Sequence, residues 1–297
     1  MENPPLLVIV GETASGKSAL ALQLAQQLNG EIVCADSWTV RREVNIGTAK
    51  PTAEEQAIVP HHLLNIADPD EDFTAAVFKR RALEAIDEIA DRGRLPLLVG
   101  GTGLYIDGVV YDFGFLPAGD RREREEFNRL SVAELLAEIE ARGLELGGID
   151  IRNKRRLIRL LETNGARPQR KELRANTVMI GLKTDRTILS ARIEQRVDAM
   201  LAAGLEQEVK DLAEHYGWDC EALKGVGYAQ WQDYFLGAAS LETTRERIIK
   251  ATRDLAKRQR TWFKRNPQII WFDTPVDQAS VVDFVTTHLN TQNWRLS

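Results

Sequence analysis

The sequence has few cysteines and no long apolar run, and each shortage excludes a class of protein. Two cysteines among 297 residues, Cys34 and Cys220, are too few for a disulfide framework, and their spacing fits no metal site. No run of about 18 apolar residues is present, which argues against a membrane-spanning helix. The first residues, MENPPLLVIVGE, lack the basic segment of a secretory signal. We therefore expect a protein of the reducing cytoplasm that spans no membrane. A monomer is expected as well, but these features do not bear on the oligomeric state.

An excess of positive charge is also missing overall, but the charge is unevenly distributed. The formal net charge is -5. Residues 152–174 nevertheless carry nine Lys/Arg against two Glu, and residues 245–265 carry nine against one Glu and one Asp, so each stretch has a net charge of +7. This segregation is typical of a surface that contacts a polyanion. Solvated helix faces would give the same composition, so charge alone leaves both interpretations open.

Short apolar runs alternate with segments of helical periodicity. The runs expected to be strands are residues 6–10, 31–36, 95–101, 177–182 and 268–273, and the clearest helical segments are 18–28 and 73–93. Buried strands separated by helices predict an α/β protein with a parallel sheet and helices on both faces. Residues 113–175 show no strand signal. The prediction is a discontinuous core of residues 1–112 and 176–297 with an all-helical insertion at 113–175.

The segment GETASGKS, residues 11–18, matches the phosphate-loop pattern G-x-x-x-x-G-K-[ST] between an expected strand and an expected helix. Its glycines let backbone N–H groups surround an anion, Lys17 adds a point charge, and the Ser18 hydroxyl is a ligand for Mg²⁺. The residues expected to bind a phosphate or diphosphate are Gly11, Glu12, Thr13, Ala14, Ser15, Gly16, Lys17 and Ser18. The core is therefore expected to be P-loop NTPase-like, although the motif does not say what happens to the ligand.

The positions of acidic residues near this loop help to distinguish phosphotransfer from other reactions of a bound phosphate or diphosphate. Hydrolysis or kinase chemistry requires a metal-binding carboxylate at the end of a later strand, but the run at 95–101 ends in GGT instead. Asp36 closes the run at 31–36 and, with Thr102, is expected to face Lys17 at the carboxyl edge of the sheet. A carboxylate beside the phosphates suits a general base for an acceptor. A helix cap or a metal ligand is the alternative role for Asp36.

Several segments together resemble the tRNA dimethylallyltransferases, also called tRNA isopentenyltransferases, over nearly the whole chain. The matching pieces are GETASGKSALA (11–21), ADS (35–37), NIGTAKPT (45–52), HHLLNIADP (61–69), LPLLVGGTGLYI (95–106), NKRRLIRLLE (153–162), RIEQRVDAMLAAGLEQEV (192–209), GVGY (225–228) and TRDLAKRQRTWF (252–263). Their order and spacing carry the resemblance.

The resemblance implies transfer of a dimethylallyl group from dimethylallyl diphosphate to N6 of the adenosine 3′-adjacent to a tRNA anticodon. In that reaction Thr13, Lys17 and Ser18 with Mg²⁺ would bind the leaving diphosphate. Arg196 would be a further diphosphate ligand, and Asp36 would be the base, so Asp36, Arg196 and Thr13 are the implied catalytic residues. By spacing alone, Arg192 and Arg196 are equally compatible with surface ion pairs on one helical face.

The resemblance also implies a set of tRNA contacts, because a stacked base must be pulled out of the anticodon loop before it reacts. The implied residues are Asp36, Ser37, Trp38, Thr39, Thr102, Arg124, Arg155, Arg156, Arg159, Lys257, Arg258 and Arg260. Trp262 and Phe263 are candidates for stacking on a nucleobase, with packing in the core as the alternative.

Some positions depart from the family pattern. Glu12 stands where proline is usual and adds a negative charge beside the phosphates, Thr39 and Arg41 replace glutamine and tyrosine, and Lys224 and Gly225 replace glutamine and alanine. Two other functions stay open. One is an isopentenyltransferase that acts on free adenine nucleotides, and the other is a non-catalytic RNA-binding relative or a P-loop phosphotransferase.

Overall fold

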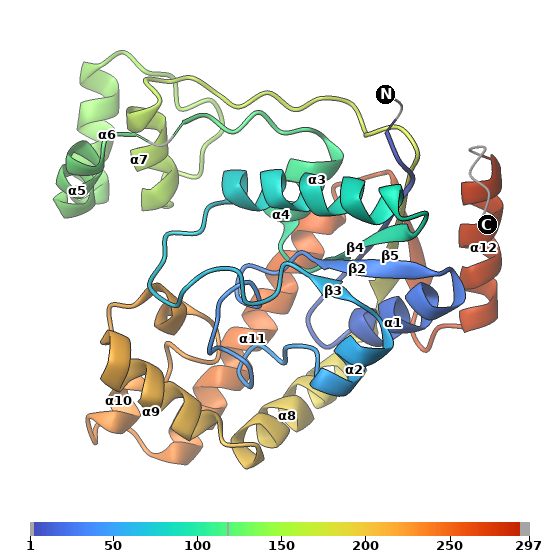
Figure 1. Ribbon diagram of the computed structural model, residues 1–297. Coiled ribbons are helices and arrows are strands. Elements are labelled where there is room, and N and C mark those ends of the chain that lie inside the picture. The colour runs from blue at the N-terminus through green and yellow to red at the C-terminus, as the bar shows by residue number, and fades with distance from the viewer. Residues whose placement is uncertain (1–2, 118, 292–297) are drawn as a thin grey trace. The chain divides into compact units, whose positions relative to one another are not determined.

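The computed structural model describes residues 3–117 and 119–291 (Figure 1). The chain divides into two compact units, one formed by residues 1–110 and 173–297 and the other by residues 111–172. The sequence places the corresponding boundaries at 112/113 and 175/176, within three residues of these.

The larger unit is built on a six-stranded sheet in which every neighbouring pair is parallel. Its strands are β1 (Leu6–Gly11), β2 (Gly30–Cys34), β3 (His61–His62), β4 (Leu95–Gly100), β5 (Thr177–Lys183) and β6 (Ile269–Asp273), in the order β3-β2-β4-β1-β5-β6. The expected α/β class is confirmed. The short strand β3 was not expected, and the run that predicted β2 was too long, because β2 ends at Cys34 and leaves Asp36 in the following turn.

Helices cover both faces of this sheet, as Figure 1 shows for α3 and α4 on one side and α1 on the other. The helices that contact the sheet here are α1 (Lys17–Gln27), α3 (Ala75–Asp91), α4 (Gly103–Val110) and α12 (Gln278–Thr291). The short helix α2 (Ala53–Ile58) precedes β3 and buries none of its residues. Apolar side chains of α1 and α12 share one core with the strands, including Leu24 and Val285, which are fully buried. The strands are apolar on both sides because both faces are covered.

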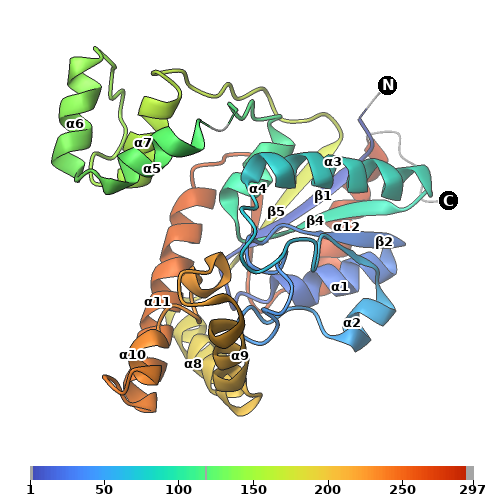
Figure 2. The same cartoon turned by 60° about the vertical axis from the view of Figure 1, so that its left-hand side comes forward.

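A second group of helices follows β5 and packs together on its own apolar core (Figure 2). It consists of α8 (Arg186–Ala202), α9 (Leu205–Tyr216), the 3₁₀ helix η1 (Glu221–Lys224), α10 (Gln232–Phe235) and the long α11 (Leu241–Phe263). Tyr228 and Trp231 are fully buried in this core. Both α8 and α11 present side chains to the pocket beside the phosphate loop.

The smaller unit is helical, with α5 (Arg121–Arg129), α6 (Val132–Ala141) and α7 (Lys154–Glu162). α5 and α6 begin at Asp120 and Ser131, whose side chains accept hydrogen bonds from the first free N–H groups of each helix. Seven buried side chains, including Phe127 and Leu157, form its core. No helix in the described part of the chain combines the length and the apolar character needed to cross a bilayer.

Candidate active site

The phosphate loop runs from the end of β1 to the start of α1, as the pattern requires. Gly16 has φ 94° and Ala14 has φ 61°, so two residues adopt the left-handed conformation and turn backbone N–H groups inward. A Cβ at Gly11 would lie 2.8 Å from Ser15 Oγ, which explains glycine at that position. Ser15 Oγ is buried and has no hydrogen-bond partner among the described residues. The loop is therefore shaped to receive a polyanion.

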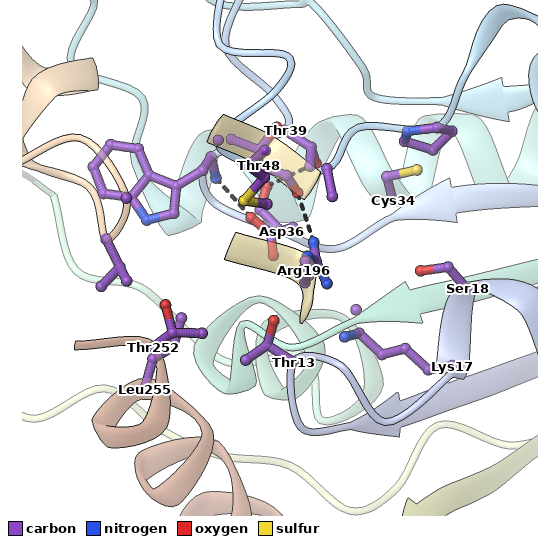
Figure 3. A pocket seen from close by; sticks show the side chains of 18 of the residues that line it. Thr13, Lys17, Ser18, Cys34, Asp36, Thr39, Thr48, Arg196, Thr252 and Leu255 are labelled. Carbon is purple, nitrogen blue, oxygen red and sulfur yellow. Dashed lines mark hydrogen bonds between the residues drawn. The ribbon is translucent and has the colours of Figure 1, made fainter. Parts of the chain in front are cut away.

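The residues that the sequence predicts to take part in catalysis or in binding the diphosphate and Mg²⁺ lie in one pocket. Thr13, Lys17, Ser18, Asp36 and Arg196 all line it, and Figure 3 shows the two cationic side chains directed into the same space as Asp36. The rest of the lining is largely apolar and comes from β2, α8, α11 and the segment before α10; it includes Ile32, Ile193, Val197, Met200, Val226 and Leu255. Cationic and apolar side chains that line one pocket suit an amphiphilic ligand.

The two cations of the pocket, Lys17 and Arg196, are largely shielded from solvent. Burial, followed by the nearby Arg196 charge, lowers the pKa of Lys17 from 10.5 to about 8, against the opposing effects of Asp36 and Glu12. Burial also lowers the pKa of Arg196, which still remains charged. Arg196 Nη2 donates to the carbonyl oxygen of Thr48 at 3.2 Å. The two cations repel each other, and a polyanion that binds to both relieves this repulsion, which favours its binding.

Asp36 lies in the turn after β2, where its Oδ1 accepts the N–H of Trp38 at 2.9 Å. This contact fixes the carboxylate in a local turn. Residues 37–40 form a turn and not a helix, so Asp36 is not a helix cap. No ion pair joins Asp36 to a cation among the residues described. The N–H of Ser37 donates to Thr102 Oγ1 at 3.0 Å, which joins the turn to the end of β4. Asp36 is thereby positioned with its other oxygen available to an acceptor.

The end of β4 has no room for the acidic residue of a phosphotransferase. A Cβ at Gly100 would lie 2.0 Å from the carbonyl oxygen of Ala35, so only glycine fits. A Cβ at Gly101 would lie 2.2 Å from Nε2 of Gln259. The Thr102 N–H donates to the same Ala35 oxygen at 3.2 Å. At the end of β4, where a phosphotransferase has its metal-binding carboxylate, this protein therefore has backbone contacts with the Asp36 turn.

Glu12 does not face the phosphate site, contrary to the concern raised by the sequence. It is 4% exposed, and its carboxylate binds the guanidinium of Arg260 on α11 at two points, with Nη2 2.8 Å from Oε2. The ion pair neutralises Glu12 and raises the pKa of Arg260. Next to it, the N–H of Thr13 donates to Oε1 of Gln259 at 2.7 Å. α11 thus holds the phosphate loop at two consecutive residues.

The residues present fit a magnesium ion that shares its ligands with a diphosphate. Ser18 supplies its hydroxyl, an oxygen donor of the kind that Mg²⁺ prefers, to the pocket beside the phosphate loop. No cluster of three or more metal-ligating side chains occurs in the described chain. Mg²⁺ commonly relies on one or two protein oxygens, substrate phosphates and water, so this sparse donor set is adequate.

The basic stretch 245–265 lies on α11 and the turn after it, and it divides into paired and unpaired residues. Five of its cations contact carboxylates in the structure: Arg245, Arg247, Lys250, Arg253 and Arg260. Lys257, Arg258, Lys264 and Arg265 are exposed and have no carboxylate partner in the described chain. The unpaired charge gathers at the C-terminal end of the stretch.

The basic stretch 152–174 begins on α7 of the smaller unit. Glu162, whose side chain is fully buried, binds Arg124 at 2.7 Å and Arg159 at 3.1 Å. Arg159 also donates to the carbonyls of Leu116 and Pro117. Arg155 and Arg156 are exposed. The four predicted contacts therefore comprise two arginines held by one carboxylate and two that project into solvent.

Other residues singled out by the sequence have structural roles. Phe263 is buried, and Trp262 Nε1 donates to Asp107 at 3.1 Å, so core packing accounts for both aromatics. Arg41 is 5% exposed and donates to the carbonyls of Asp68, Pro69 and Glu71. No sequence motif had indicated the contacts of Gln259, or those of Glu208, which accepts three backbone N–H groups from residues 45–47.

Comparison with known proteins places this geometry among relatives. Residues 39–266 match the model of a family described as IPP transferase. The chain is 41% identical over 302 residues to a tRNA dimethylallyltransferase of Bacillus subtilis, covering 96% of each chain. It is also 42% identical over 285 residues to a tRNA dimethylallyltransferase of Bacillus cytotoxicus, covering 90% of each.

Two solved structures agree in fold. The full-length tRNA isopentenylpyrophosphate transferase of Bacillus halodurans is 39% identical, with a TM-score of 0.78 over 98% of both chains. A eukaryotic dimethylallyltransferase acting on tRNA is 26% identical, with a TM-score of 0.77 over 96% of this chain and 80% of that one. The expected resemblance and the P-loop-like fold are confirmed. The chain belongs to the IPP transferase family.

Proposed function

We propose that the chain transfers the dimethylallyl group of dimethylallyl diphosphate to N6 of the adenosine 3′-adjacent to the anticodon in tRNA. The observation that carries this proposal is the convergence of Lys17, Arg196 and Asp36 on a single pocket whose remaining lining is largely apolar. Cations suit the diphosphate, the apolar lining suits the hydrocarbon, and the carboxylate suits the acceptor amine.

The leaving diphosphate is bound by the phosphate loop. Its N–H groups, the Lys17 ammonium and the Arg196 guanidinium face the oxygens on which charge develops as the carbon–oxygen bond breaks. Thr13 lines the same pocket as Lys17 and Arg196 and provides a hydroxyl donor. Ser18 would hold Mg²⁺, which supplies further charge neutralisation when bound. Because the cations are already desolvated, their interaction with the diphosphate is strong.

The acceptor is activated by Asp36. The N6 lone pair of adenine is delocalised into its ring, so the amine is a weak nucleophile until its proton is removed. The new N6–carbon bond forms as the carbon–oxygen bond of the diphosphate breaks, the N6 proton passes to Asp36, and diphosphate leaves. The backbone N–H of Trp38 donates to Asp36, and Trp38 also lines the pocket. This supports a position for the adenine of the acceptor beside both residues.

The RNA contacts follow from the exposed cations. Lys257 and Arg258 on α11, and Arg155 and Arg156 on α7, are free to bind phosphates. Arg260, Arg124 and Arg159 are bound to carboxylates, so a tRNA contact by any of them requires it to share or exchange that partner. Ser37, Thr39 and Thr102 surround the Asp36 turn and are proposed to contact the flipped nucleotide.

An acceptor comparison tests the proposal. Purified protein, Mg²⁺ and dimethylallyl diphosphate labelled in its carbon chain are incubated with unmodified tRNA, with AMP, or with neither. We expect label in tRNA and none in AMP. Label in AMP alone would favour the enzyme of free nucleotides, and RNA binding without any transfer would favour the non-catalytic relative.

A further inference from the structure

Three of the sequence segments that carry the family resemblance meet away from the reacting atoms, at the carboxylate of Glu208. The segments are residues 45–52, the end of 192–209, and GVGY at 225–228. Glu208 lies in the first turn of α9, and none of the roles assigned above uses it. Its partners come from the other two segments.

Glu208 is saturated with donors. Its oxygens accept N–H groups of Asn45 at 2.9 Å, Ile46 at 2.8 Å and Gly47 at 3.1 Å, and Oε1 accepts the hydroxyl of Tyr228 at 2.6 Å. Hydrogen bonds to an ionised acceptor are roughly twice as strong as those between neutral groups. One carboxylate therefore fixes three consecutive backbone groups and a buried phenol.

Tyr228 completes the contact by packing. It is fully buried, and a Cβ at Gly47 would lie 2.6 Å from its ring, so the loop backbone packs directly against the hydroxyl end of the ring. Lys50 adds a further restraint by donating to Oδ1 of Asn45 at 3.0 Å and of Asn65 at 2.6 Å. The loop of residues 45–48 is thus held by Glu208, Tyr228 and Lys50.

The next residue of this loop reaches the pocket. Thr48 lines the pocket, and its carbonyl oxygen accepts Nη2 of Arg196 at 3.2 Å. Figure 3 shows this contact as the dashed line between Thr48 and Arg196. Arg196 is a flexible side chain, and this carbonyl is the acceptor that orients its guanidinium.

We propose that Glu208, with Tyr228, is a positioning residue for the diphosphate site, which holds the 45–48 loop so that the Thr48 carbonyl aims Arg196 at the diphosphate. The inference rests on the role of Arg196 in the proposed function. It predicts that altering the carboxylate weakens diphosphate binding although Glu208 does not line the pocket.

The test measures the affinity of the full-length protein for inorganic diphosphate with Mg²⁺ by calorimetry. Glu208→Gln keeps the size of the side chain but turns an amide toward N–H donors, and we expect about a tenfold loss of affinity. The matched control is Glu206→Gln, two residues earlier on α9, because Glu206 accepts the Tyr234 hydroxyl at 3.0 Å without touching the loop. The control should bind diphosphate as the unaltered protein does.

A double-mutant cycle separates positioning from general stability. In an Arg196→Gln background, Glu208→Gln should cause no further loss of diphosphate affinity, since the group it positions is gone. An undiminished loss in that background, or equal losses for Glu208→Gln and Glu206→Gln, would overturn the inference. Tyr228→Phe, compared with Tyr234→Phe, gives the same comparison if Glu208→Gln does not fold. If the unaltered protein binds diphosphate but transfers no dimethylallyl group, the proposed function fails and this inference is still decided by binding.

Discussion

Glu12 in the phosphate loop and Arg260 on α11 form a two-point ion pair although 248 positions separate them in the chain. Only 5% of the Glu12 side chain is exposed, against 22% for Arg260. The pair explains how a carboxylate is accommodated next to a diphosphate site. It also ties the loop to the same helix that carries Lys257 and Arg258, which are proposed to bind tRNA.

Removing Arg260 should expose the diphosphate to the charge of Glu12. We expect Arg260→Ala to weaken diphosphate binding about tenfold, because a buried charge that has lost its partner costs on the order of 3–5 kcal/mol and repels an incoming anion. Calorimetry with diphosphate alone measures this loss without any contribution from tRNA. Adding Glu12→Gln to Arg260→Ala should restore most of the affinity, whereas failure of the second substitution to restore it would contradict the account.

Replacing the proposed base should affect the chemical step alone. Asp36→Asn keeps the size of the side chain and the acceptor for the Trp38 N–H, but it cannot take a proton. We expect the single-turnover rate of transfer to tRNA to fall by about 10²–10⁴-fold. Diphosphate affinity should be equal to or above that of the unaltered protein, because a negative charge is removed. A rate within a few-fold of the original would remove Asp36 from the mechanism.

Diphosphate binding should weaken in alkaline solution. Lys17 has a pKa of about 8 in the ligand-free protein, so above that pH the ammonium loses its charge and the site loses a cation. The loss is expected to be about tenfold, the typical value of one charged hydrogen bond. Lys17→Gln provides the control, since its weaker binding should not show this step. The linkage to folding has the opposite sign: because the folded pKa lies below the ordinary 10.5, the contribution of Lys17 to the stability of the ligand-free protein rises between about pH 8 and 10.5.

The close approach of β4 to the Asp36 turn should tolerate no side chain. Gly100→Ala would place a methyl group 2.0 Å from the carbonyl oxygen of Ala35, and we expect a loss of unfolding free energy of at least about 2 kcal/mol, measured by urea denaturation. Gly114→Ala is the control, because its nearest neighbour would be 3.6 Å away. Equal stability of the two variants would show that the Asp36 turn is not held in this way.

The unpaired cations of α11 should bind phosphates. Lys257→Ala and Arg258→Ala are each expected to weaken tRNA binding and to lower the slope of log affinity against log salt by about 1. Lys210→Ala on α9 removes a similar surface charge, one already paired with Glu214, and should leave the slope unchanged. Filter binding over a range of salt concentrations measures all three. An unchanged slope for the α11 variants would exclude that surface as a tRNA contact.

Local patterns predicted the elements that depend on local chemistry. The strand around Val8 and the helix around Ile86 were predicted to within two residues, because apolar runs and helical periodicity reflect burial directly. The phosphate loop was predicted from the spacing of its glycines, lysine and serine, which is also a local pattern. The two-residue strand β3 was missed, since His61 and His62 carry no apolar signal.

Contacts between distant segments were out of reach. Glu12 looked unfavourable because nothing in its neighbourhood indicates Arg260, and the roles of Gln259 and Glu208 depend on helices that follow the loop by more than 150 residues. The charge count of the basic stretch did not indicate that five of its cations are paired with carboxylates, which are Asp198 and Glu194 on α8, Asp233 on α10, Asp254 on α11 and Glu12 in the phosphate loop. Charge counts along a sequence do not reveal such partners.

In the proposed reaction, diphosphate is released from the pocket and the hydrocarbon is transferred to the acceptor. The most direct measurement uses dimethylallyl diphosphate carrying one label in its carbon chain and a second in its terminal phosphate, with unmodified tRNA as acceptor. The account predicts that the carbon label enters the tRNA and the phosphorus label is recovered as free diphosphate. Recovery of the phosphorus label in the tRNA, or as single phosphate with no carbon label in the RNA, would contradict it.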